Sequence, residues 1–357
     1  MVAVAEAPTA LRTSPVGAVM AGERPPQPYE HRRPTWGQRA QLGGQLWLVC
    51  VLGVVIAAFS VRSSSFLSQA NWLNTALTAT EVLLLAVGQT FVIITGGIDL
   101  SDGAVLGLSG MVAGWVMAQL GGSSAGDPTL VVVAGLASGL VLGVAVGLVN
   151  GLLVARFRIP AFVVTLGTLG ICTGIADLVA NGQEISNLPS AVGTIGSTNL
   201  FGWVPIPALV AFVLTVAAAG LLRLTRFGEH TLALGDSRDA AVRAGIRDRS
   251  HLVRVYVLSS TLAAVSGMLV MTRLAVASPT SGSNDELNAI AAVVIGGASL
   301  FGGKGTILGS FLGTALISVL LTGLIIVNVP PFWQLIAVGA VLVAAVYVDQ
   351  VRERRLR

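Results

Sequence analysis

Side chains that could carry chemistry are few in this 357-residue chain. The carboxylates Asp99 and Asp102 form a near pair at a glycine-rich turn. The run GGKG at 302–305 approaches a phosphate-binding loop, but a Walker A motif needs Gly in place of Ala298 and Ser or Thr in place of Gly305. We therefore predict no catalytic, metal or cofactor site in this chain. The histidines, none of them at metal-ligand spacing, are His31, His230 and His251.

Neutral polar side chains, in contrast, recur within the apolar stretches. Amides and hydroxyls can exchange hydrogen bonds with an uncharged polyhydroxylated solute without the desolvation cost of a charge. Any one of them could instead pair between helices and hold the bundle together. As a set they favour a path for a polar, uncharged solute. The residues that we take as the candidate translocation path are Gln89, Thr95, Asn150, Thr165 and Thr168.

The composition around these groups is that of an integral membrane protein. Hydrophobic residues make up 54% of the chain and charged residues only 11%, against about 25% charged in soluble proteins. One crossing takes about 20 apolar residues. Two runs, 46–60 and 287–301, are shorter than that and could be broken or re-entrant helices. We predict an all-α, polytopic bundle of about ten transmembrane helices at 46–60, 79–95, 102–119, 130–155, 161–180, 206–222, 253–273, 287–301, 305–327 and 332–348.

The distribution of positive charge predicts the orientation, because cytoplasmic loops retain Lys and Arg. With both termini in the cytoplasm, 19 of the 21 basic residues fall inside, and only Arg62 and Arg273 fall outside. The arginines do not cluster on a soluble domain, which disfavours nucleic acid as a partner. Residues 1–45 hold six of the 14 prolines and are predicted to be a disordered cytoplasmic tail. The transmembrane domain then covers 46–350, and 351–357 form a basic cytoplasmic tail.

One predicted cytoplasmic loop, 223–253, is much longer than the others and is rich in arginine. A short helix can form within it from Asp239, with Ser237 as its N-cap and Gly245 as its C-terminal stop. A short helix between two spans lies on the membrane surface. It could be a solvated connector or a docking element for a cytoplasmic partner.

Two glycine-rich segments, 96–110 and 296–313, are weakly similar. A duplicated half, as is common among transporters, explains the similarity, and so does glycine-rich composition alone. Both segments are predicted on the cytoplasmic side, which leaves the symmetry of a repeat open. The glycines that we pair as structural turns are Gly96 with Gly296 and Gly97 with Gly297.

Four ordered motifs resemble one family over residues 45–350. They are GGIDLSDGAVLGLSG at 96–110, NGLLVARFRIPAFVVTLGT at 150–168, FGEHTLALGDSRDAAVRAGI at 227–246, and ELNAIAAVVIGGASLFGGKGT at 286–306 followed by PFWQ at 331–334. The chain resembles the membrane permease subunits of bacterial ABC sugar importers of the ribose, xylose and galactose type. The resemblance implies the larger, ten-helix (type II) importer permease fold in a multi-pass protein of the bacterial cytoplasmic membrane. It also implies a non-catalytic subunit.

The resemblance further implies partners and a mechanism. The protein partners are a second permease copy in a homodimer or heterodimer, a cytoplasmic ATPase with two nucleotide-binding domains that binds the ATP, and an extracytoplasmic sugar-binding protein. The bundle would contact the sugar substrate and membrane lipid. Nucleic acid is not expected as a partner. ATP-driven closure of the ATPase would drive alternating access through a coupling helix. One departure is visible, since Asp236-Ser237 stand where the family has Gly-Asn. The residues that match the coupling helix are Ser237, Asp239, Ala240, Ala241, Gly245 and Ile246.

Other classes of function are weighed against this one. An ion-coupled secondary carrier of a small polar solute would need a protonatable group in mid-membrane, whereas Glu81 is predicted at the start of a span and no Lys or Arg is predicted in mid-membrane. An enzyme acting on lipid-linked sugars would have to use Asp99 and Asp102. A passive channel would leave the loop at 223–253 idle. Which sugar is carried is not determined by the sequence.

Overall fold

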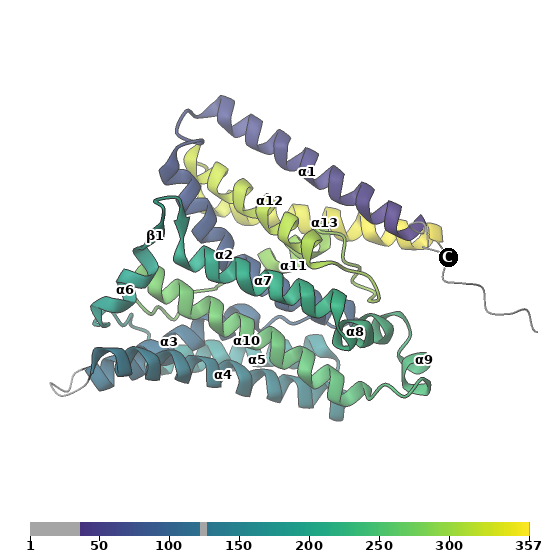
Figure 1. The fold of residues 1–357 in the computed structure, drawn as a ribbon, viewed down its shortest axis with the longest axis horizontal. Helices are drawn as coiled ribbons and strands as arrows, with labels where there is room; N and C mark the ends of the chain where they lie inside the picture. The colour runs from purple at the N-terminus through teal and green to yellow at the C-terminus, as the bar shows by residue number, and fades with distance from the viewer. Residues whose placement is uncertain (1–35, 122–126, 357) are drawn as a thin grey trace, which may run out of the picture. The chain divides into compact units, whose positions relative to one another are not determined.

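The computed structural model describes residues 36–121 and 127–356. The chain divides into two compact units, Met1–Gln41 and Leu42–Arg357, and the second contains the helix bundle (Figure 1). The elements are α1 (Trp36–Arg62), α2 (Gln69–Ile94), α3 (Asp102–Gly121), α4 (Pro128–Arg156), α5 (Ala161–Val179), α6 (Ser190–Ser197), β1 (Asn199–Leu200), β2 (Val204–Pro205), α7 (Ile206–Leu224), α8 (Arg226–Asp236), α9 (Arg238–Arg243), α10 (Asp248–Leu274), α11 (Asp285–Ile295), α12 (Ile307–Ile326) and α13 (Pro331–Leu356).

The prediction of a polytopic helical membrane protein is confirmed. Within the described ranges, eight helices are long and apolar enough to cross a bilayer, and α13 adds a shorter apolar stretch, Pro331–Ala344. The two strands, β1 and β2, form a small antiparallel hairpin at the opposite end of the bundle from α8 and α9 (Figure 1). The long loop predicted at 223–253 is largely helical, because α8, α9 and the start of α10 lie within it.

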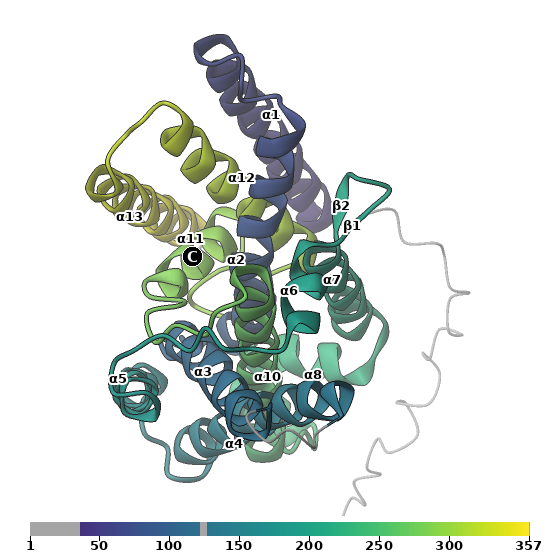
Figure 2. The same cartoon turned by 90° about the vertical axis from the view of Figure 1, so that its left-hand side faces the viewer.

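The centre of the bundle is built on α10, which packs against α2, α3 and α4 (Figure 2). Glycines recur at every fourth residue of α4 along the face toward α10 and α3, so that the helix backbones approach closely. At Gly147, for example, an added Cβ would lie 2.7 Å from the carbonyl oxygen of Tyr256. Small residues thus set the spacing of helices in an environment where water exclusion cannot drive their association.

The span predicted at 287–301 is wrong as a crossing helix. The helix there, α11, has only eleven residues and is about 16 Å long, which is half of the hydrocarbon thickness. It ends because Gly297 takes a left-handed conformation, with φ of 88°. Before it, residues 275–284 are non-helical. The short apolar run is therefore a broken helix, and residues 275–284 before it lie along the bundle as irregular backbone.

Three further boundaries differ from the predicted ones. Helix α1 begins at Trp36, so residues 36–45 of the predicted disordered tail are helical, and residues 1–35 lie outside the described residues. Helix α2 begins ten residues before the apolar run at 79, because Ser68 caps it and accepts a hydrogen bond from the backbone N–H of Asn71. At the other end, α13 continues to Leu356 through most of the predicted basic tail. Polar residues at the helix ends hid these extensions.

Candidate functional site

A chain of buried hydrogen bonds joins the connection between α2 and α3 to helices α4 and α5. The Oδ1 atom of Asp99 accepts from the backbone N–H of Ser101 at 2.9 Å and from its hydroxyl at 2.6 Å. The Asn150 side-chain amide donates to the Ser101 Oγ at 2.9 Å, and the Thr168 hydroxyl donates to the Asn150 Oδ1 at 2.6 Å. All four side chains are buried. We name Asp99, Ser101, Asn150 and Thr168 the central polar network.

The other candidate path residues lie around the same connection. The Gln89 amide, in the orientation that satisfies both its atoms, bridges the backbone N–H and carbonyl of Asp99. Thr165 donates to the carbonyl oxygen of Ile98 at 3.2 Å. Thr95 caps the end of α2, where its hydroxyl donates to a backbone carbonyl, and it lines a cavity beside α9. The structure thus brings the five candidates to one connection, and Gln89, Asn150, Thr165 and Thr168 are buried there. Their role as a path stays a prediction.

Residues that sequence reasoning missed complete this arrangement. Ser101 links Asp99 to Asn150, and Ser259 on α10 donates to the Oδ2 of Asp102 at 2.9 Å. Among the described residues, the second oxygen of each carboxylate has no hydrogen-bond partner. The sequence signal that could have indicated them is the group of polar residues just before α3, Asp99, Ser101 and Asp102. In the structure this group lies against α10 and not in solvent. Over the described ranges, no group of three His, Cys, Asp or Glu residues could hold a metal ion.

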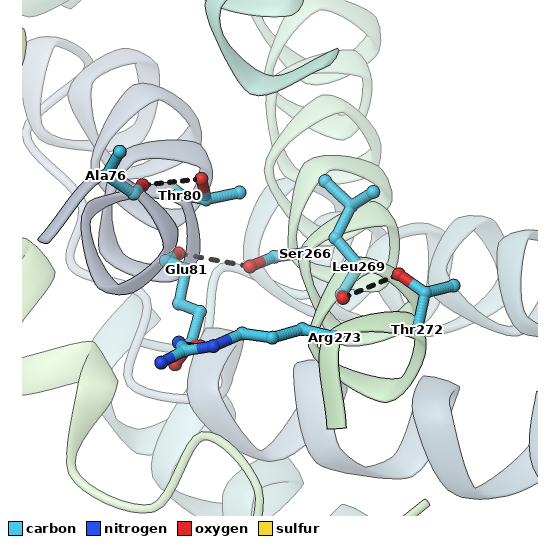
Figure 3. A network of polar contacts seen from close by, with 7 residues as sticks. All are labelled: Ala76, Thr80, Glu81, Ser266, Leu269, Thr272 and Arg273. Carbon is cyan, nitrogen blue, oxygen red and sulfur yellow. Dashed lines mark hydrogen bonds and ion pairs between the residues drawn. The ribbon is translucent and has the colours of Figure 1, made fainter. Parts of the chain in front are cut away.

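An ion pair crosses from α10 to α2, where the sequence predicted none. Arg273 donates from Nη1 to the Oε1 of Glu81, and Ser266 donates to the Glu81 carbonyl oxygen at 3.0 Å (Figure 3). Glu81 is not at the start of a span but twelve residues into α2, and the long Arg273 side chain reaches it from the last turn of α10. Pairing compensates both charges, so that removing either one would leave the other uncompensated in the bundle.

The predicted cap and stop of the short helix in the long loop are confirmed. The Ser237 hydroxyl accepts from the backbone N–H of Ala240, and Gly245 adopts φ of 90°. The Gly245 N–H donates to the Val242 carbonyl, and the next N–H donates to the Ala241 carbonyl. These two bonds form a Schellman motif, which satisfies carbonyls that a helix end leaves free. Helix α9 is therefore a locally determined, well-terminated unit despite its six residues.

Helix α9 presents a mixed surface of small, apolar and charged residues. Ala241 is buried against the rest of the protein, whereas Asp239, Ala240 and Arg243 are exposed and Val242 is 47% exposed. Beside the helix is a cavity of about 790 Å³, which extends to the end of α2 and the start of α10. The basic residues that line it are Arg158, Arg238, Arg243 and Arg249.

Helix α8 links α9 to two glycine-rich connections, the one from α2 to α3 (residues 95–101) and the one from α11 to α12 (residues 296–306). Its penultimate residue, Gly235, lies directly against Ile94 at the end of α2 and Gly303 in the loop before α12. The Gly303 N–H donates to the Ile94 carbonyl at 2.9 Å. A Cβ at Gly235 would overlap the backbone of both segments. A displacement of α9 would therefore be transmitted through α8 to the two segments at once.

The pairing of glycines predicted from the sequence is shifted by one residue. Helix α2 ends in a Schellman motif with Gly96 in the left-handed region, at φ of 80°. Helix α11 ends in the same motif, but there the left-handed residue is Gly297, whereas Gly296 has φ of −62°. Gly96 is therefore the counterpart of Gly297, and Gly97 is the counterpart of Ala298. Gly296 is small for another reason, since it packs against the backbone of Gly309.

These features define a multi-pass membrane transport protein of the permease class, with broken and irregular segments inside the bundle and a short, capped helix, α9, at one end. The family described as the permease component of branched-chain amino acid transport systems matches residues 71–346. The chain belongs to this family.

Curated relatives cover nearly the whole chain. The ribose import permease protein of Escherichia coli strain K12 is 36% identical over 323 residues, which is 88% of this chain and 96% of the relative. The D-allose transport system permease protein of the same strain is 32% identical, over 84% of this chain and 90% of the relative. The L-arabinose ABC transporter permease protein of Azospirillum brasilense is 32% identical, over 89% and 91%. No solved structure matches the chain.

Proposed function

We propose that this chain is the transmembrane permease subunit of an ABC importer that carries a monosaccharide or a related polyol into the cytoplasm. The observation that carries the proposal is the near full-length similarity to permeases named for ribose, allose and arabinose. The name of the matched family refers to branched-chain amino acids, which carry two charges that a transport path must compensate. The candidate path consists instead of neutral amides and hydroxyls, which suit an uncharged sugar.

The coupling role belongs to α9. Its exposed residues Asp239, Ala240 and Val242 offer a small, shallow surface that fits a cleft of a cytoplasmic ATPase, and arginines beside it attract acidic groups of that partner. Gly245 and Ile246 terminate the helix, while Ser237 starts it and Ala241 anchors it to the bundle. Closure of the ATPase dimer on ATP would push this helix and, through α8, both glycine-rich connections.

Movement of these connections would produce alternating access. The central polar network joins the connection before α3 to α4 and α5, so that tilting α2 and α3 would strain this small set of hydrogen bonds. We propose that Gln89, Thr95, Asn150, Thr165 and Thr168 exchange these bonds for bonds to the sugar as the bundle opens. The ligand supplies the replacement donors and acceptors, and the equilibrium between outward-open and inward-open states shifts accordingly.

The proposal places the chain in a complex of the bacterial cytoplasmic membrane. A second permease copy, an ATPase with two nucleotide-binding domains and an extracytoplasmic sugar-binding protein complete the machine. ATP is bound and hydrolysed by the ATPase, and the permease itself uses no cofactor. Nucleic acid has no part in it. Neither homodimer nor heterodimer is favoured by the residues of this chain.

Reconstitution in liposomes tests the proposal directly. The chain is incorporated with its ATPase, the binding protein is supplied outside, and uptake of radiolabelled ribose, allose and arabinose is measured with ATP enclosed. We expect uptake of at least one sugar that requires ATP and survives collapse of all ion gradients. Uphill uptake by the chain alone, or uptake that follows an ion gradient without ATP, would instead establish an ion-coupled carrier.

A further inference from the structure

A small polar cavity lies at the surface of the bundle, between α3, α5 and the segment that precedes α11, apart from the cavity beside α9. Its volume is about 190 Å³, which is the volume of about six water molecules and is on the scale of one monosaccharide. The polar residues that line it are Thr173, Ser281, Ser283, Asn284 and Glu286, and the small or apolar ones include Gly103 and Leu169. A few convergent polar groups on a small or apolar wall are typical of a ligand site.

Contacts with α10 give the depth of this cavity. Ser259, which bonds to Asp102, lies eleven residues into the 27-residue α10, or about 17 Å from its start. Gly103, which follows Asp102 in the chain, lines the cavity and lies against Gly282 and Glu286. The cavity therefore lies near the midpoint of a helix that crosses the membrane, far from either end of the bundle.

The backbone at this depth is irregular and polar. Residues 275–284 are non-helical, and the side chains of Ser283 and Asn284 are exposed on the surface of this chain. In a bilayer, such backbone is tolerated only where it is covered by protein or lines a water-filled space. The cavity therefore opens toward a wet or protein-covered space and not toward lipid tails.

The side chain of Asn284 does not cap the helix that follows it. This residue lies immediately before α11 and has φ of 70°. Asn adopts the left-handed region more readily than other non-glycine residues, so the backbone here does not require a hydrogen bond from this side chain. The amide is thus available to donate to one hydroxyl and accept from another.

We infer that this cavity holds one monosaccharide during its passage through the permease, with Thr173, Asn284 and Glu286 bonding to its hydroxyls. The inference rests on the proposed function and adds a position for the substrate. The cavity is next to the central polar network, since its lining residue Leu169 follows Thr168 of that network, and Gly103 follows Asp102, which bonds to Ser259. A sugar in the cavity would therefore lie beside the hydrogen bonds that we expect to rearrange.

Substitutions at Thr173 test the inference in the reconstituted complex. We expect Thr173→Val, which keeps the shape and removes the hydroxyl, to lower sugar uptake at least tenfold, and Thr173→Ser to restore it to within twofold of wild type. Thr173→Phe, which fills the cavity, should reduce uptake to background. The matched control, Ile171→Phe, places the same ring at another exposed position of α5 and should transport normally. Wild-type uptake by Thr173→Phe would overturn the inference.

Labelling gives an independent measurement that does not depend on turnover. The two native cysteines, Cys50 and Cys172, are first replaced by Ser and Ala, and Asn284→Cys is introduced into the reconstituted complex. We expect a charged, water-soluble thiol reagent to modify this position, and sugar delivered by the binding protein to slow the modification at least threefold. An unreactive Asn284→Cys, or labelling that sugar does not slow, would count against the site. If wild type takes up no sugar at all, the proposed function fails before either measurement applies.

Discussion

The connections that follow α2 and α11 start with the same backbone motif but serve the bundle differently. After Gly96 the chain reaches α3 at Asp102, and its polar groups are buried in the central polar network. After Gly297 it takes four residues more to reach α12 at Ile307, and it forms a loop that contacts α8. The first connection joins transmembrane helices to one another, and the second joins them to α8, which leads into α9. The two similar sequences thus form the same helix-end motif, and the residues that follow the motif determine which helices each connection contacts.

The contact of α8 with both connections is where a substitution should have the largest effect. Gly235→Val would force α8 away from Ile94 and Gly303, because no space exists for a side chain there. We expect a loss of about 1–3 kcal/mol in stability and a loss of sugar uptake. Thermal unfolding in detergent and uptake in liposomes measure the two effects.

A matched control for this substitution lies on the preceding helix. Gly220 in α7 has nothing within 4 Å of an added Cβ, so Gly220→Val should leave unfolding and uptake close to wild type. If Gly235→Val behaves like Gly220→Val, then α8 does not transmit movement to the two connections.

The next largest effect concerns coupling without loss of the bundle. Gly245→Arg adds a bulky charge to the end of α9, where the space is open and the backbone is left-handed. We expect it to abolish transport and sugar-stimulated ATP hydrolysis while the protein remains inserted in the membrane at normal levels. Gly245→Asn, which tolerates the left-handed region, should retain most activity. Full transport by Gly245→Arg would remove the docking role from α9.

The third comparison contrasts two hydroxyls that lie just before helices. Ser101→Ala removes the link between Asp99 and Asn150 and should cost about 1–3 kcal/mol, because buried polar groups lose their partners. Thr306→Ala removes the cap of α12, where Oγ1 accepts from the Gly309 N–H, and a long hydrogen bond from Gln45 at 3.4 Å, and should cost about 1 kcal/mol. Thermal unfolding of both variants ranks them, and the reverse order would show that the central polar network is not the stronger connection.

The smallest effect tests the shifted pairing of glycines. Gly96→Asn and Gly297→Asn should each cost less than about 1 kcal/mol, since Asn tolerates the left-handed conformation and neither position has atoms within 4 Å of an added Cβ. Gly296→Asn should cost clearly more, because it would press on Gly309. Equal tolerance at Gly296 and Gly297 would contradict the shifted pairing. Unfolding midpoints compared side by side provide the measurement.

Much of the site could be located from the sequence, and its internal bonding could not. Gln89, Asn150, Thr165 and Thr168 stood out because a polar residue in an apolar stretch is costly unless it has a purpose. Their mutual hydrogen bonds depend on how α2, α4 and α5 pack, and no local pattern encodes that packing. The ion pair of Arg273 with Glu81 was missed for the same reason, since only the tertiary structure brings the two side chains together.

The sequence by itself determined that this is a polytopic helical membrane protein, because hydropathy and charge act on each segment separately. It also determined the short helix from Ser237 to Gly245, whose cap and stop are interactions between residues close in the chain. Only the tertiary structure decided that residues 275–284 enter the bundle as irregular backbone and that α11 is half a span. The physical reason is that irregular backbone survives in a membrane only when other parts of the protein surround it, and those parts are distant in sequence.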